Sequence, residues 1–210
     1  MHRPKAAAVA EIILTEIVPK DFVDKNVATL GYAAVAGDTG NFRWNFSPET
    51  LRLAAMLLER GADTLLFLDK YFFSKTKTYF EMLAFAVENV EYFDDLGTAF
   101  LFLPYEKLHE AGFDKEGLKE IKQAFNQEFA RAVIGYPRGF IMYEEWPGKV
   151  HVHARGANLR NKINLPELLA DIGGNCGGHF HAAGLQIEGD FEEVKKSLIG
   201  ALRKRVARSD

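Results

Sequence analysis

The sequence predicts an α/β chain in three parts: a helical segment over residues 1–75, a helical connector over residues 76–90 and an α+β domain over residues 91–210. Two patterns lead to this division. Apolar residues recur at helical spacing in the first part, whereas β-rich runs separated by turn residues alternate with helical patterns in the last. With 210 residues, 48% of them hydrophobic and 26% charged, the chain is also long enough to bury a substantial core.

The first part is expected to contain only helices. Ser47 is a suitable N-cap and Pro48 suits the first helical position, so a helix is expected to begin there and to stop at Gly61. The spacing of apolar residues predicts further helical segments at residues 6–18, 21–36, 63–73 and 77–87.

Beyond the connector, strands and helices are expected to alternate. Strands are predicted over residues 87–93, 98–103, 139–144 and 149–154 and near 184–188. Helices are predicted over residues 114–131 and 165–171, and a last one is expected to begin after Asp190, a suitable N-cap. Residues 173–184 are expected to form a glycine-rich loop.

Charge and cysteine content limit the classes of function. The net charge of -3 produces no global field that would attract nucleic acid, so a polyanion site must be a local basic patch. Cys176 is the only cysteine, which excludes an internal disulfide and fits a reducing cytoplasm. The apolar run at residues 6–18 is interrupted by Glu11 and Glu16 and is too short to span a bilayer. A cytoplasmic location without membrane association is therefore expected.

The glycine-rich loop is the first candidate site. Gly177 and Gly178 allow the backbone to approach a ligand closely, and the following His179 can donate a hydrogen bond or a charge to a phosphate. The alternative is a tight turn that needs positive φ angles. No Gly-Lys-Ser/Thr follows, so the loop is not a P-loop.

The second candidate is Asp38, in the loop Gly37-Asp38-Thr39-Gly40. A carboxylate held between glycines after an apolar helix can bind a hard divalent cation. The alternative is an Asx-turn that only reverses the chain.

The third candidate is the strand that carries His151, His153 and Arg155 on one face. Arg155 can hold a phosphate through two parallel hydrogen bonds. The histidine pair can bind zinc only with further ligands, and the alternative is a solvated outer face. The basic residues near the C-terminus are interpreted as a solvated helix end: Arg203, Lys204, Arg205 and Arg208.

Taken together, these stretches resemble the DHH phosphoesterases. Residues 34–51, which include the Asp-Thr-Gly sequence at Asp38, are similar to the third motif of that family. Residues 176–184 are similar to the glycine-rich substrate loop of the DHH-associated C-terminal domain, and His179 falls on the histidine of that loop. The strand that ends at Arg155 resembles the basic strand that precedes this loop.

The resemblance implies a C-terminal helical part of a DHH domain, a helical connector and a mixed-sheet DHH-associated domain. It also implies a manganese-dependent hydrolase of short oligonucleotides or nucleotides, nearest to the oligoribonuclease and nucleotide-phosphatase branch. Asp38 is then the metal ligand and catalytic residue. Arg155, Gly177, Gly178 and His179 then bind the substrate, a short single-stranded RNA or DNA or a nucleotide.

Two motifs of the family, the aspartate-x-aspartate loop and the Asp-His-His sequence, have no match in the 210 residues. One aspartate cannot hold two metal ions, so a missing N-terminal segment or a second copy of the chain is expected to complete the site. The chain is accordingly expected to be a fragment or a truncated form, and to expose an apolar face on its first helices. The alternative function is a non-catalytic nucleotide- or nucleic-acid-binding module, and a third is a structural dimerisation unit.

Overall fold

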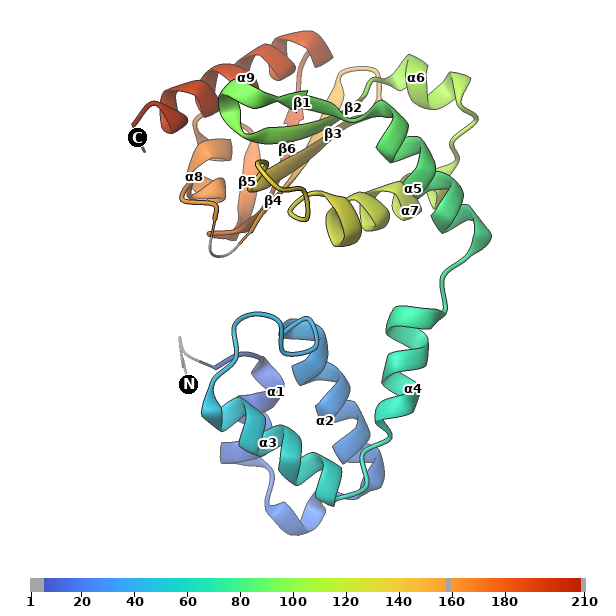
Figure 1. Ribbon diagram of the computed structural model, residues 1–210, viewed down its shortest axis with the longest axis vertical. Coiled ribbons are helices and arrows are strands. Elements are labelled where there is room, and N and C mark those ends of the chain that lie inside the picture. Colours follow the sequence, from blue (N-terminus) through green and yellow to red (C-terminus); the bar gives the residue numbers. More distant parts are fainter. Residues whose placement is uncertain (1–5, 158–159, 209–210) are drawn as a thin grey trace. The chain divides into compact units, whose positions relative to one another are not determined.

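The computed structural model describes residues 6–157 and 160–208 and confirms the mixed α/β class (Figure 1). Two compact units make up the chain, Met1–Lys75 and Thr76–Asp210. Among the residues described, the first unit contains one hydrophobic core and the second contains two. In the part of the chain that the structure describes, no helix is both long and apolar enough to cross a membrane.

The described part of the first unit is helical. Its elements are α1 (Val9–Ile12), η1 (Ile13–Ile17), η2 (Lys20–Phe22), α2 (Lys25–Asp38), α3 (Pro48–Glu59), α4 (Thr64–Leu68) and η3 (Asp69–Phe73). The core of this unit joins Leu14 of η1 to Leu57 of α3. Gly31 of α2 permits this packing, because a Cβ there would lie 2.6 Å from the Cδ1 atom of Leu14.

A buried carboxylate links the first helix to the third. Glu11 is 8% exposed, and its Oε2 atom accepts hydrogen bonds from the amide of Ala7 and the hydroxyl of Thr50, both at 3.0 Å. Thr50 also completes a capping box with Ser47, which is the N-cap of α3 as predicted. Since a buried charge is stable only with such partners, Glu11 fixes the start of α3 against α1.

The second unit is built on a six-stranded sheet in the order β1-β2-β3-β4-β6-β5. The strands are β1 (Glu91–Phe93), β2 (Thr98–Leu103), β3 (Arg138–Trp146), β4 (Lys149–Gly156), β5 (Asn175–His179) and β6 (Ala182–Glu188). β2 and β3 are parallel, and the other neighbouring pairs are antiparallel. The helices are α5 (Lys77–Asn89), η4 (Asp94–Leu96), α6 (Tyr105–Glu110), α7 (Lys115–Ala124), η5 (Phe125–Phe129), α8 (Leu165–Ala170) and α9 (Phe191–Val206).

Helices cover the two faces of this sheet unequally (Figure 1). On one face, α8 and α9 enclose a core to which β2, β3, β4 and β6 contribute buried residues. On the other face, α5 and α7 enclose a second core whose buried strand residues come from β2 and β3, and none of the buried residues described there belongs to β4, β5 or β6. The second face of β4, β6 and β5 thus lies beside a helical layer without forming part of its core.

Two local predictions were wrong, and one helix was missed. The strand expected over residues 87–93 begins only at Glu91, because α5 continues to Asn89 and buries Ala86. The loop expected over residues 173–184 is largely the hairpin of β5 and β6, since pairing with β6 orders a glycine-rich stretch of low strand propensity. Helix α6 after Pro104 was not predicted.

The first helical turns expose an apolar stripe. Val9, Ile13 and Ile17 follow one another at spacings of four residues and are 69%, 40% and 61% exposed. We predict that the purified chain self-associates through this stripe, because burying it removes apolar surface from water. In multi-angle light scattering, the double substitution Val9→Ser and Ile17→Ser should lower the apparent mass. A wild-type chain that is monomeric at high concentration and melts cooperatively would contradict this prediction.

Candidate functional site

The face of the candidate site is set by alternation along β4. Val150, Val152 and Ala154 are buried in the core beneath α8 and α9. Successive side chains of a strand point to opposite faces, so His151, His153 and Arg155 lie on the other face. The sequence predicted that these three residues share one face, and the alternation along β4 places them so.

Small residues form the floor beside that row. Arg155 pairs with Ala182 of β6, which pairs with His179 of β5. His153 is followed in the same way by Gly184 and Gly177. The third row consists of His151, Gln186 and Asn175. On this face, three side chains of β4 (His151, His153 and Arg155) and one of β5 (His179) therefore border a strip of glycine and alanine.

The glycines of this hairpin serve different purposes. Gly178 has a φ angle of +142°, and a Cβ there would lie 2.2 Å from the carbonyl oxygen of Ala182, so the fold itself requires glycine. A Cβ at Gly177 would meet nothing within 4 Å, and one at Gly184 would have its nearest neighbour, the Val152 carbonyl oxygen, at 3.8 Å. The protein's own packing does not demand glycine at these two positions. Their effect is to leave the space above the sheet at these positions without side chains.

Arg155 and His179 are the two ends of the cross-strand row whose middle residue is Ala182. Their backbones are two strand spacings apart, about 9–10 Å, which the long arginine side chain can bridge to reach a common ligand. Arg155 donates from Nη1 to the carbonyl oxygen of Ala154 at 2.9 Å, and within the described residues no carboxylate forms an ion pair with it. Burial lowers the pKa of Arg155, yet an arginine stays charged in proteins. His179 is exposed. This pair is suited to an anionic group.

An aromatic and basic cluster adjoins the row of histidines. The ring of Tyr143 lies nearly parallel to those of His151 and His153, at centroid distances of 4.9 and 5.8 Å. Lys122 of α7 places its Nζ atom 3.3 Å from the Tyr143 hydroxyl. Burial lowers the pKa of Lys122 and raises that of Tyr143 to about 12. Sequence patterns gave no signal for this cluster, because α7 and β3 meet only in the folded chain.

The same cluster does not form a zinc site. His151 Nε2 lies 3.1 Å from Glu145 Oε2, and the same carboxylate oxygen lies 2.9 Å from Lys149 Nζ. His153 is held neutral because burial, followed by the charge of Lys122, lowers its pKa to about 4. Across residues 6–157 and 160–208, no group of three or more His, Cys, Asp or Glu side chains is placed to hold a metal ion.

Asp38 lies in the first unit, as the last residue of α2, and is exposed. Its carbonyl oxygen accepts a hydrogen bond from Trp44 Nε1 at 3.2 Å. The loop that follows is unusual, since Asn41, Phe42 and Asn45 all have φ angles between +50° and +60°. Non-glycine residues in this region are strained, and such strain is concentrated at functional sites.

The Asp38 loop is held by a buried hydroxyl. Thr39 is fully buried; its Oγ1 atom donates to the Val35 carbonyl at 2.8 Å and accepts from the Phe42 amide at 3.0 Å. A single carboxylate offers two oxygen ligands, whereas a manganese ion prefers six ligands in octahedral geometry. The described residues around Asp38 therefore do not by themselves fit a two-metal site.

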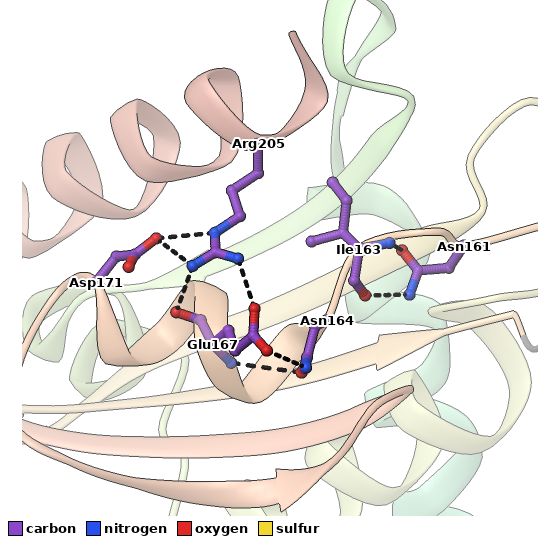
Figure 2. Close-up of polar contacts among 6 residues, drawn as sticks. All are labelled: Asn161, Ile163, Asn164, Glu167, Asp171 and Arg205. Atoms are coloured by element: carbon purple, nitrogen blue, oxygen red, sulfur yellow. Dashed lines mark hydrogen bonds and ion pairs between the residues drawn. The ribbon is translucent and has the colours of Figure 1, made fainter. Parts of the chain in front are cut away.

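Helix α9 holds the element that precedes β5 (Figure 2). Arg205 donates from Nε to Asp171 Oδ2 at 2.8 Å and from Nη1 to Glu167 Oε2 at 2.9 Å. It also donates from Nη2 to the Glu167 carbonyl at 3.2 Å. The interpretation of Arg205 as a solvated helix end was therefore wrong. It joins the last turn of α9 to α8, and α8 leads directly into the glycine hairpin.

Comparison with known proteins gives one family match. The family model of the DHHA1 domain matches residues 105–208. This range includes the sheet face with Arg155, Gly177, Gly178 and His179 and excludes Asp38.

Solved structures provide a second comparison. An exopolyphosphatase-related protein from Bacteroides fragilis is 19% identical, with a TM-score of 0.81, over 99% of this chain and 59% of that one. A pGpG-specific phosphodiesterase from Vibrio cholerae is 13% identical, with a TM-score of 0.42, over 93% of this chain and 61% of that one. RecJ from Thermus thermophilus in complex with Mn²⁺ is 16% identical, with a TM-score of 0.41, over 87% and 24%. The first match shows a shared fold, and the chain spans less than two thirds of each of these proteins.

The depressed pKa of His153 generates a prediction. The folded chain should keep His153 neutral down to about pH 4, whereas the unfolded chain takes up a proton near the ordinary value of 6.5. Unfolding then binds a proton within this window, so the free energy of unfolding should fall as the pH drops from 6.5 toward 4. Lys122→Met should raise the pKa of His153 in an NMR titration, because a neighbouring positive charge is removed. A His153 that titrates near its ordinary value in the wild type would contradict the burial described.

Proposed function

Since the C-terminal part of this chain is a DHHA1 domain, we propose that the chain is the substrate-binding part of a DHH phosphoesterase that acts on short oligonucleotides or nucleotides. The observation that carries the proposal is the open sheet face, where Arg155 and His179 border a floor kept clear at Gly177 and Gly184. Guanidinium and imidazole groups bind phosphate. A flat floor of glycine and alanine can accept the sugar or base attached to the phosphate.

The phosphate is proposed to bind between Arg155 and His179. Arg155 supplies a fixed positive charge and His179 a hydrogen-bond donor from its exposed ring. Gly178 is proposed to contribute through its backbone, and its φ angle of +142° lies in the range that favours glycine. Lys122 adds positive charge near His153. This local basic surface accounts for polyanion binding by a chain whose net charge is -3.

Hydrolysis is proposed to require ligands that the described residues do not bring to Asp38. In this proposal Asp38 is one ligand of a divalent metal site, with Mn²⁺ the ion expected from the family resemblance. The metal would activate water for attack on the phosphoester. The strained loop that holds Asp38 in place supports a functional role for it.

A non-catalytic binding module is the second candidate. It is favoured by one observation: the described residues present no group of three metal-ligating side chains. The two candidate functions differ in their dependence on metal. A binding module binds its ligand equally well with manganese and with a chelator, and it never hydrolyses the ligand. A phosphoesterase gains turnover once the remaining ligands are supplied.

Filling the floor should prevent binding. Gly184→Val places its methyl groups above the sheet, where the nearest heavy atom to a Cβ is 3.8 Å away, so the fold should be kept. We expect the dissociation constant for 3′-phosphoadenosine 5′-phosphate, measured by calorimetry, to rise by about tenfold or more, or about 1.4 kcal/mol. Gly200→Ala, at an equally open glycine of α9, is the control and should bind normally. Normal binding by Gly184→Val would exclude this face as the site.

The completeness of the metal site can be tested directly. The purified chain is assayed with Mn²⁺ against 3′-phosphoadenosine 5′-phosphate and a 5′-labelled RNA of a few nucleotides, beside Asp38→Ala. We expect binding that weakens in His179→Ala, without turnover, because one carboxylate does not make a two-metal site. Turnover that disappears in Asp38→Ala would show that the chain assembles an active site by itself and would refute this account.

A further inference from the structure

The tip of the β5–β6 hairpin is held from outside the hairpin. His179 and Ala182 are the last paired residues, so only Phe180 and His181 form the turn. The amide of Leu165 donates to the Phe180 carbonyl at 3.1 Å, and the amide of Gly156 donates to the His181 carbonyl at 2.8 Å. Both backbone carbonyls of the turn are thus fixed by neighbouring segments.

A buried amide makes the side-chain contact to this turn. Asn161 is 3% exposed, and its Nδ2 atom lies 3.3 Å from Nδ1 of His181. The same Nδ2 donates to the carbonyl of Ile163 at 2.8 Å, while Oδ1 accepts from the amide of Ile163 at 3.3 Å (Figure 2). Rotating the amide by half a turn would set oxygen against oxygen and nitrogen against nitrogen. The backbone of Ile163 therefore determines that Asn161 presents a donor to His181.

This donor determines the state of the imidazole. Nδ1 of His181 must carry a lone pair to accept from Asn161, so the proton of the neutral ring resides on Nε2. Burial lowers the pKa of His181, which also favours the neutral ring. Asn161 thus holds His181 in one tautomer and one orientation.

Gly156 makes room for this arrangement. A Cβ at Gly156 would lie 2.5 Å from Asn161 Nδ2 and 2.8 Å from its Cγ atom. The amide of Asn161 is therefore packed directly on the residue that follows Arg155. One side chain touches the end of the arginine strand and the turn that follows His179.

We propose that Asn161 is a positioning residue for the anion site. Through its contacts with His181 and Gly156 it fixes the cross-strand row that has Arg155 at one end and His179 at the other. The residue does not touch the ligand. Its role at the site rests on the proposed function, whereas its hold on the turn can be tested without any ligand.

The ligand-free test uses NMR on the full chain. In the wild type, long-range ¹H–¹⁵N spectra should show His181 protonated at Nε2 only. In Asn161→Ala both tautomers should appear, and the amides of Gly156 and Leu165 should exchange about fivefold to tenfold faster, as expected for a lost hydrogen bond. Gly156→Ala should reproduce this result by displacing the amide. Asn164→Ala, which removes the N-cap of α8 on the same segment, is the matched control and should leave His181 unchanged.

The second test measures binding of 3′-phosphoadenosine 5′-phosphate. Asn161→Ala and His181→Leu should each weaken binding by about tenfold, and the double variant should be no weaker than either, because both remove the same contact. His181→Asn keeps an acceptor at the δ position and should bind within about threefold of the wild type.

The outcomes distinguish the two proposals. Normal ligand binding and unchanged amide exchange in Asn161→Ala would overturn this inference alone. Absence of binding by the wild type would overturn the proposed function and with it the role of Asn161 at the site. In that case the NMR result would still show whether Asn161 holds the turn.

Discussion

The second unit depends on the register of β4. The core beneath α8 and α9 buries one set of β4 side chains, those of Val150, Val152 and Ala154. The alternating set must then lie on the opposite face of the sheet: His151, His153 and Arg155. A shift by one residue would bury the imidazoles and the guanidinium and expose the apolar set. The packing of the core thus also fixes the face on which the proposed ligand-binding residues of this strand lie.

Helices determine which part of the sheet stays outside the second core. The core beneath α5 and α7 takes its buried strand residues from β2 and β3, and none of the buried residues described in it belongs to β4, β5 or β6. Lys122 and Tyr143 stand at this border and join the helical layer to the row of histidines. Lys122, partly buried, brings positive charge to the row without lying on the open floor itself.

Much of this organisation was predictable. The helix after Ser47, the strand over residues 98–103 and the helix after Asp190 follow from caps and local patterns, and the structure has all three. The glycine hairpin was predicted as a loop, because its strand character comes from pairing with β6 and not from its own residues. The shared face of His151, His153 and Arg155 follows from strand alternation. By contrast, Lys122, Asn161 and Arg205 act through partners more than fifteen residues distant, which no local pattern reveals.

The contacts of Arg205 connect the C-terminal end of α9 to α8. Arg205 lies in the final turn of this helix. Its hydrogen bonds to Asp171 and Glu167 hold α8, and α8 leads into the glycine hairpin. A deletion that removed Arg205 would break these contacts, so the C-terminal end of α9 bears on the segment that precedes the glycine hairpin.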